Sequence, residues 1–288
     1  IREGTEVKVA DLIRGIVIQS GNDASVAMAE FIAGDEQAFA DIMNQVAQKL
    51  GMTRTQFKNA TGLPNEGHYT TAKDLSLLAR ALIRDFPEHY KVYKEKYFSY
   101  NDIRQANRNS LLWRDDAVDG MKTGHTQAAG FCLVASAEKK ELRLISVVMG
   151  ATSERSRSTE SQKLINYGFR YFESVKLYDG LESLKRVKVW GGLHESLDVG
   201  IEAPVQLTIP NGARGALAAE VTLDPVIKAP VGHGQTLGLL RISLEGETLL
   251  ERPVVALNAV DEAGFVSSLI DEVSLFFLSM FSGDPLAL

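Results

Sequence analysis

The sequence has little of several residue types that point to particular chemistries. It contains a single cysteine, Cys132, so no disulfide bond can form within the chain. Its five histidines show no metal-ligand spacing such as H-E-x-x-H, and three-glycine phosphate loops are absent. We therefore expect neither a metal nor another cofactor. Cys132 lies in the apolar run 131–135, which predicts a buried strand residue rather than a reactive thiol.

Long apolar runs and an excess of basic residues are missing as well. No uninterrupted apolar stretch reaches the roughly 18 residues that predict a membrane-spanning helix. With 31 basic and 37 acidic side chains the formal net charge is −6, whereas domains that bind nucleic acid are usually basic. We expect no nucleic-acid partner. The 45% share of hydrophobic residues is nevertheless ordinary for a soluble protein and sufficient for a buried core.

The length of 288 residues suits about two domains. The chain opens with Ile1 and carries no apolar core of a secretory signal near its first residues. We expect it to be a processed product or a fragment, with any targeting segment already absent.

The first 174 residues combine helix and strand patterns. Apolar residues at helical spacing, Gly51 as a helix end and the capping-type spacing of Thr71 and Asp74 predict helices before Pro87. The expected helices are residues 5–19, 23–33, 36–50 and 70–85, with a further one at 158–172. Between them, the β-branched runs 130–137 and 141–149 predict a hairpin that turns at 138–141. Helices on both sides of a hairpin favour an α+β layered fold.

The remaining residues divide into two parts. Short apolar runs separated by proline and glycine predict a small all-β domain over 175–258, with Glu245-Gly246 as a hairpin turn. Residues 259–288 form a third part, an amphipathic helix with a tail. Its apolar positions would share one helix face; they are Phe265, Val266, Leu269, Ile270, Val273, Phe276, Phe277 and Met280.

Two short motifs can carry chemistry. Ser20-Gly21-Asn22 falls between two expected helices, where Gly21 permits a tight turn and a hydroxyl and an amide stand side by side. An ordinary N-cap is the alternative, because serine and asparagine are preferred at that position. Lys122-Thr123-Gly124 falls at the start of an expected strand and offers a lysine, a hydroxyl and an unhindered backbone for a carboxylate.

Together the motifs match the S-x-N and K-T-G elements of penicillin-binding proteins and class A β-lactamases. Residues 12–29, 103–109, 118–126 and 168–172 strongly resemble the low-molecular-mass penicillin-binding proteins of D-alanyl-D-alanine carboxypeptidase type. The resemblance covers essentially the whole chain. It implies a penicillin-binding, serine β-lactamase-like transpeptidase domain over 1–174, here without its N-terminal part, then the small all-β domain and the amphipathic helix.

The resemblance also implies a serine acyl-transfer reaction that removes the terminal D-alanine of a peptidoglycan pentapeptide, with β-lactams as covalent inhibitors. In it, Ser20 relays a proton to the leaving amine, assisted by Lys122, while Asn22 holds the peptide amide. Gly21 shapes the turn, Thr123 binds the substrate carboxylate, and Gly124 and the backbone N–H of His125 receive the peptide and the oxyanion. Arg108 and Arg157 would help to neutralise that carboxylate, with a solvated surface position as the alternative for each.

One departure concerns the nucleophile. The family carries its acylated serine in an S-x-x-K motif that precedes S-x-N, and none of the 19 residues before Ser20 forms one. Ser136-Ala-Glu-Lys139 matches the letters, but it follows K-T-G and has no helix to align its serine and lysine. We expect the true nucleophile segment upstream of Ile1, so that this chain by itself is catalytically incomplete.

Two other functions stay open at this stage. A class A-like β-lactamase would need a deacylating glutamate between the motifs, and neither Glu66, Glu88 nor Glu95 stands in a recognisable context for it. A non-catalytic wall-binding protein would not need both motifs. The resemblance further implies residence on the periplasmic face of the inner membrane, bound to the membrane surface through residues 265–281.

Overall fold

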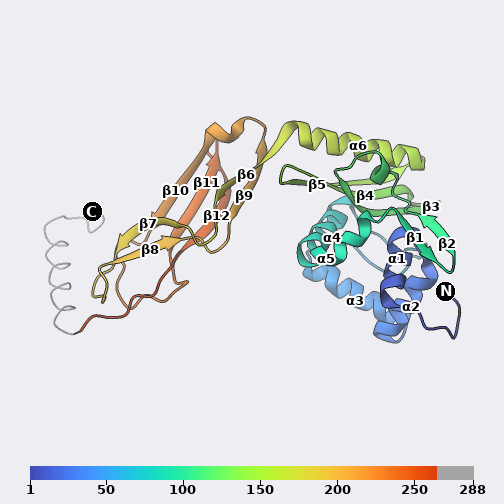
Figure 1. Ribbon diagram of the computed structural model, residues 1–288, viewed down its shortest axis with the longest axis horizontal. Helices are drawn as coiled ribbons and strands as arrows, with labels where there is room; N and C mark the ends of the chain where they lie inside the picture. Colours follow the sequence, from blue (N-terminus) through green and yellow to red (C-terminus); the bar gives the residue numbers. More distant parts are fainter. Residues whose placement is uncertain (265–288) are drawn as a thin grey trace. The chain divides into compact units, whose positions relative to one another are not determined.

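The computed structural model describes residues 1–264, which form two compact units, Ile1–Tyr171 and Phe172 onward (Figure 1). The division falls three residues before the boundary expected between 174 and 175. The helix expected within 265–281 lies outside the described residues. No helix among those described is both long and apolar enough to cross a bilayer.

The first unit contains the α-helices of the described residues, a two-stranded sheet and a three-stranded sheet. Its helices are α1 (Val9–Gln19), α2 (Asn22–Ala33), α3 (Glu36–Lys49), α4 (Ala72–Asp85), α5 (Pro87–Tyr90), α6 (Glu154–Tyr171) and the short 3-10 turns η1 (Lys91–Lys94) and η2 (Ser110–Trp113). Its strands are β1 (Tyr97–Tyr100), β2 (Ile103–Ala106), β3 (Val118–Thr126), β4 (Gly130–Lys139) and β5 (Leu142–Ala151).

The antiparallel sheet β3-β4-β5 is the centre of this unit. Helix α6 packs against β4 and β5 on one side, and α4 contacts the same strands from the helical layer on the other (Figure 1). Buried apolar residues of β3 and β4, with Leu111, Leu112 and Ile165, form the core under α6. The predicted α+β layering is confirmed. Cys132 lies on β4 as expected but is half-buried rather than buried.

Several boundaries differ from the sequence-based expectation. Helix α1 begins at Val9 rather than at residue 5. Helix α6 begins at Glu154, four residues earlier than expected, because the Ser153 hydroxyl caps it by accepting from the Ser156 N–H at 3.0 Å. The predicted Thr71 cap of α4 is confirmed, with its hydroxyl accepting from the Asp74 N–H at 3.2 Å.

Hairpin turns account for the other differences. The β4–β5 turn consists of Lys140 and Glu141 alone, because both adopt positive φ (49° and 64°) and form a two-residue connection. Strand β4 therefore continues through Lys139. The β1–β2 hairpin, which the sequence analysis does not anticipate, turns on Asn101 and Asp102 in the same way, with φ of 48° and 59°.

The second unit is all β, as predicted. It contains β6 (Phe172–Tyr178), β7 (Ser183–Lys188), β8 (Ser196–Gly200), β9 (Val205–Pro210), the turn η3 (Ala213–Ala216), β10 (Leu217–Leu223), β11 (Thr236–Leu244) and β12 (Glu247–Ala256). Strands β6 and β9 pair with each other, and the rest form one sheet in the order β10-β11-β12-β8-β7. The predicted Glu245-Gly246 turn joins β11 to β12.

The end of this unit corrects the third predicted segment. The sequence places residues 259–262 in the amphipathic segment, but Val260 is buried in the β core and pairs with Val231. Glu262 bridges to Gly192 in the same unit. The all-β unit therefore continues past Asn258, because an apolar side chain at 260 completes its core.

Candidate active site

Ser20 occupies the junction between α1 and α2 in a left-handed conformation. Its φ is 58°, and its N–H still donates to Ile16 O at 3.0 Å, so the serine ends α1 and turns the chain at once. A left-handed position costs a residue with a side chain roughly 1–2 kcal/mol. The alternative that Ser20 is an ordinary N-cap of the next helix is wrong, because Ser20 is the C-cap of α1 and the N-cap of α2 is Gly21.

Gly21 serves the junction differently from the prediction. Its φ is −63°, so the turn does not depend on glycine's access to positive φ. A Cβ on Gly21 would instead lie 3.2 Å from Asp23 Oδ1 and 3.4 Å from Gly15 O. A side chain at position 21 would therefore need the Asp23 carboxylate to shift by a few tenths of an ångström, and the left-handed residue of the junction is Ser20.

Lys122 brings the second motif to Ser20. It lies in the middle of β3, not at the start of the strand, and its Nζ donates a hydrogen bond to Ser20 Oγ across 102 residues of sequence. The same Nζ donates to Thr123 O at 3.0 Å. Burial, with repulsion from Arg108 and Arg157, lowers the Lys122 pKa to about 8. This ammonium gives up its proton more readily than an ordinary lysine.

Arg157 is buried, so the solvated alternative for this residue is wrong. Only 3% of it is exposed, and it lies in the first turn of α6 rather than before the helix. One guanidinium nitrogen donates to Gly124 O at 3.2 Å, and another lies 3.4 Å from a Glu154 carboxylate oxygen. Its Nε is buried without a hydrogen-bond partner. Desolvation by burial, and to a smaller extent repulsion from the positive charge of Arg108, lowers the pKa of Arg157.

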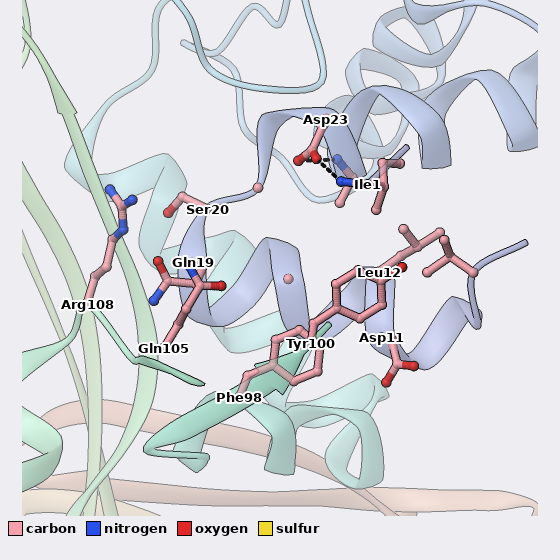
Figure 2. A pocket seen from close by; sticks show the side chains of 14 residues that line it. Ile1, Asp11, Leu12, Gln19, Ser20, Asp23, Phe98, Tyr100, Gln105 and Arg108 are labelled. Carbon is pink, nitrogen blue, oxygen red and sulfur yellow. Dashed lines mark hydrogen bonds and ion pairs between the residues drawn. The ribbon is translucent and has the colours of Figure 1, made fainter. Parts of the chain in front are cut away.

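Arg108 is exposed, and its positive charge acts on both Lys122 and Arg157. The backbone N–H of Arg108 donates to Ile18 O at 3.3 Å, and this bond joins the residue to the end of α1. Figure 2 shows Arg108 and Ser20 at the same end of a cavity of about 340 Å³. Two arginines, Arg108 and Arg157, thus lie close enough to Lys122 to repel its charge, and three cationic side chains grouped in this way attract a carboxylate.

The rest of K-T-G forms the free edge of the sheet, since β4 is the one neighbour of β3 in the described sheet. Thr123 is almost buried, whereas Gly124 and His125 are exposed. The His125 ring stacks on Phe131, with 3.9 Å between the ring centroids. Asn22 is exposed in the first turn of α2, and within residues 1–264 no hydrogen bond joins it to Ser20 or Lys122.

The Ser136–Lys139 pair does not form a site. Both residues lie on β4, where side chains three positions apart point to opposite faces. Ser136 is buried and accepts from Arg143 at 2.7 Å, while Lys139 pairs with Asp115 at 3.6 Å. Among the described residues, no group of three histidine, cysteine, aspartate or glutamate side chains is arranged to hold a metal.

The sequence analysis misses Asn107 and Asn109, which flank Arg108 and are both buried. Their side-chain amides bind backbone groups of neighbouring segments. The available signal was the pair of asparagines on either side of Arg108. Burying an asparagine amide costs free energy unless the amide is hydrogen-bonded, so two buried asparagines here imply two sets of bonding partners.

Comparison with known proteins places both units in families. Residues 1–153 match the family described as D-alanyl-D-alanine carboxypeptidase, peptidase S11, and residues 172–262 match the C-terminal domain of penicillin-binding protein 5. The carboxypeptidase DacC of Escherichia coli K12 is 43% identical over 283 residues, which cover 98% of this chain and 71% of that protein. DacA of the same organism is 43% identical over 279 residues, covering 96% and 69%.

Solved structures agree. Penicillin-binding protein 5 from Haemophilus influenzae matches with a TM-score of 0.82 at 41% identity, over 90% of this chain and 76% of that one. Penicillin-binding protein D2 from Listeria monocytogenes, in its ampicillin-bound form, matches with a TM-score of 0.53 at 34% identity, over 57% and 68%. The chain therefore belongs to the S11 family of serine D-alanyl-D-alanine carboxypeptidases and is of the penicillin-binding protein 5 and 6 type.

Proposed function

We propose that Ser20 and Lys122 form the proton relay with which this carboxypeptidase releases the terminal D-alanine of a peptidoglycan pentapeptide. The hydrogen bond from Lys122 Nζ to the Ser20 hydroxyl carries this proposal. A hydroxyl between a lysine and the leaving group can receive a proton on one side and donate on the other. General acid catalysis of this kind contributes typically 10²–10⁴-fold to the rate.

The bonds change in two stages. A serine hydroxyl loses its proton to the lysine of its own S-x-x-K motif as its oxygen attacks the carbonyl of the penultimate D-alanine, the C–N bond to the terminal residue breaks, and an ester to the enzyme forms. The Ser20 hydroxyl gives its proton to the leaving nitrogen and regains one from Lys122. Water then hydrolyses the ester. The pKa of about 8 lowers the cost of that donation compared with an ordinary lysine.

The attacking serine is not among the residues considered so far. No S-x-x-K motif precedes Ser20 in the 288 residues, and Ser136 is buried on the wrong strand. We place the nucleophile in an S-x-x-K segment outside this sequence. Ser20, Asn22 and Lys122 then serve as its partners, with Asn22 orienting the substrate amide.

The substrate's free carboxylate fits the cationic part of the site. Arg108 is exposed to an incoming ligand, and the buried Arg157 holds a positive charge directly behind Gly124. Thr123 offers a hydroxyl for the same carboxylate. The exposed edge at Gly124 and His125 suits an extended peptide that adds as a further strand.

β-lactams carry a carboxylate beside a reactive carbonyl and should occupy the same site. Penicillin-binding protein D2, a relative, has been crystallised in ampicillin-bound and cefotaxime-bound forms. In our proposal a penicillin acylates the same external serine and uses Ser20 as its proton donor. Covalent labelling by a fluorescent penicillin is therefore a direct assay of the relay.

The test is the rate of penicillin labelling in full-length protein that includes the S-x-x-K segment. Lys122→Ala should slow acylation about 10³-fold and Ser20→Ala about 10²-fold, within the range of general acid catalysis. Lys139→Ala is the matched control, because Lys139 lies on the adjacent strand and pairs with Asp115; it should stay within about twofold of wild type. Wild-type labelling by the Lys122→Ala protein, with its circular dichroism unchanged, would overturn the relay. Faster turnover of penicillin than release of D-alanine would instead favour a β-lactamase.

We also propose that residues 265–281 hold the protein on the periplasmic face of the inner membrane. Four phenylalanines stand in this stretch, whereas the last basic residue of the chain is Arg252. Interfacial helices usually carry basic residues that attract anionic lipids. Binding must here come from apolar burial, at roughly 25 cal/mol per Å² removed from water. A helix face that packs on protein is the competing explanation.

Vesicle sedimentation separates these explanations. The full-length protein should sediment with anionic vesicles in both low and high salt, and a protein truncated after Glu262 should remain in the supernatant. The truncated form keeps the bridge between Glu262 and Gly192, and of the contacts of the described all-β unit it loses the hydrogen bond from Ala263 N–H to Gly191 O at 2.9 Å. Extraction by salt alone, or a truncated protein that still sediments, would rule out the anchor.

A further inference from the structure

The segment Asn107–Asn109 joins the two halves of the relay. Arg108 N–H donates to Ile18 O at 3.3 Å, and Ile18 stands two residues before Ser20. Asn109 Nδ2 donates to Gly120 O at 2.9 Å, and Gly120 stands two residues before Lys122. One short segment is thus bonded to the backbone just ahead of each relay residue.

The asparagine side chains lock this segment internally. Asn107 Oδ1 accepts from Asn109 N–H at 2.9 Å, and Asn107 Nδ2 donates to Glu95 O at 3.0 Å. Asn109 Oδ1 accepts from Leu111 N–H at 3.2 Å, which caps η2. Only 1% of Asn109 is exposed. A buried amide that uses both its oxygen and its nitrogen has a fixed orientation, because losing either bond leaves a buried polar group unsatisfied.

Gly120 is held from the other side as well. A Cβ at this position would overlap the Tyr90 hydroxyl, so Tyr90 packs directly against the glycine. Tyr90 is itself buried beside Met121. The carbonyl that Asn109 binds therefore belongs to a backbone position with little room to move.

These hydrogen bonds matter because Ser20 and Lys122 do not belong to one helix or one sheet. Ser20 ends a helix and Lys122 lies on a strand, so the hydrogen bonds within either element do not set the distance between them. A hydrogen bond weakens steeply when its geometry is lost. Misplacement of reacting groups by about 1 Å can cost about 10²-fold in rate.

We propose that Asn109 is a positioning residue for the Ser20–Lys122 pair: its bond to Gly120 O, together with the Arg108 bond to Ile18 O, fixes the separation of the two relay residues. The inference rests on the relay proposed above. Asn109 does not touch the substrate in this scheme. It acts through the backbone of β3, while Arg108 remains free to face the ligand.

The main variant is Asn109→Ser in the full-length protein. Serine is a good cap and can still accept from Leu111 N–H, but its side chain is too short to reach Gly120 O. We expect penicillin acylation to fall about 100-fold. The matched control is Asn44→Ser, because Asn44 also binds a backbone with both groups, donating to Phe57 O at 2.9 Å and accepting from Phe57 N–H at 2.7 Å. This control should lose similar thermal stability and stay within about twofold of the wild-type acylation rate.

A double-mutant cycle distinguishes positioning from general destabilisation. In a Ser20→Ala background the relay is already broken, so adding Asn109→Ser should change the residual acylation rate less than threefold. A full further 100-fold loss in that background, or a wild-type rate for Asn109→Ser alone, would overturn the inference.

Two further outcomes keep the test decisive. If Asn109→Ser does not fold, Asn107→Ala loosens the same segment from its outer end, and we expect about a tenfold loss that also disappears in the Ser20→Ala background. A wild-type rate for Asn107→Ala would then count against the proposal. If Ser20→Ala itself labels at the wild-type rate, the relay fails, which is a different result from a failure of Asn109 alone.

Discussion

The two units bury different kinds of side chain. All nine buried polar or charged residues of the described chain lie in Ile1–Tyr171, among them Asn107, Asn109 and Arg157, and none lies in the second unit. The apolar core of the first unit is divided into three small clusters, whereas that of the second is one continuous cluster. A buried polar group costs free energy unless it is bonded. The first unit carries that cost, in part at the cationic site through Arg157, and the second has the pattern of a structural domain.

The largest effect on stability should come from the core of the second unit. Leu240 is fully buried in its single cluster, so Leu240→Ala should lower the free energy of unfolding of this unit by about 2–5 kcal/mol. The chain has two tryptophans, Trp113 in the first unit and Trp190 in the second. Denaturant unfolding followed through Trp190 in a Trp113→Phe background reports the change.

Leu249→Ala is the control, because 40% of Leu249 is exposed on the same sheet; its effect should stay within about 0.5 kcal/mol. Penicillin labelling should be unchanged in both variants at temperatures where the protein is folded. Loss of labelling by folded Leu240→Ala protein would contradict the division into a chemical and a structural unit.

Lys122 should show the opposite behaviour, with a gain in stability when it is removed. Its pKa is lowered to about 8 from 10.5, so the folded state binds its proton less well than the unfolded state. The resulting cost is fully present below pH 8 and disappears as pH rises from 8 to 10.5. Lys122→Met should therefore be about 1–2 kcal/mol more stable than wild type at pH 7. This gain is smaller than the roughly 3.4 kcal/mol that corresponds to lowering the pKa from 10.5 to about 8, because the variant also loses two hydrogen bonds.

Urea unfolding at pH 7 and pH 10 measures this difference, with Trp113 as the reporter. The advantage of Lys122→Met should shrink at pH 10. A destabilised Lys122→Met protein at pH 7, or an advantage that grows with pH, would contradict the assigned direction of the shift. The same variant should lose acylation, which would place stability and activity in opposition at one residue.

The difference between the units also explains what the sequence predicts well. Alternating apolar residues and glycine-containing turns predict the all-β unit, because each strand buries one face in a single core. The first unit is predicted only in part. The hairpin at Asn101-Asp102 and the cap at Ser153 are decided by local hydrogen bonds and positive φ, which leave no apolar periodicity to read.

The candidate site divides in the same manner. The motifs single out Ser20 and Lys122, and the structure brings them into contact; their catalytic roles remain predictions. Arg157, Asn107 and Asn109 can be buried because each donates to a backbone carbonyl that lies near it only after folding. Such partners are distant in sequence, so composition and spacing cannot reveal them.

The smallest predicted effect uses one turn type that occurs in both units. Lys140-Glu141 and Glu245-Gly246 are two-residue turns in which both positions have positive φ, a geometry that favours asparagine at the first position. Lys140→Asn and Glu245→Asn should each stabilise their own unit by about 0.5 kcal/mol, since a left-handed position costs asparagine less than lysine or glutamate. Trp113 and Trp190 fluorescence during denaturant unfolding assign each gain to a unit. Equal gains in the free energy of unfolding, with unchanged penicillin labelling, would show that local turn geometry acts alike in both units. The two units would then differ in their buried polar groups and not in the energetics of this turn. A change in labelling for Lys140→Asn would instead connect the β4–β5 turn to the site.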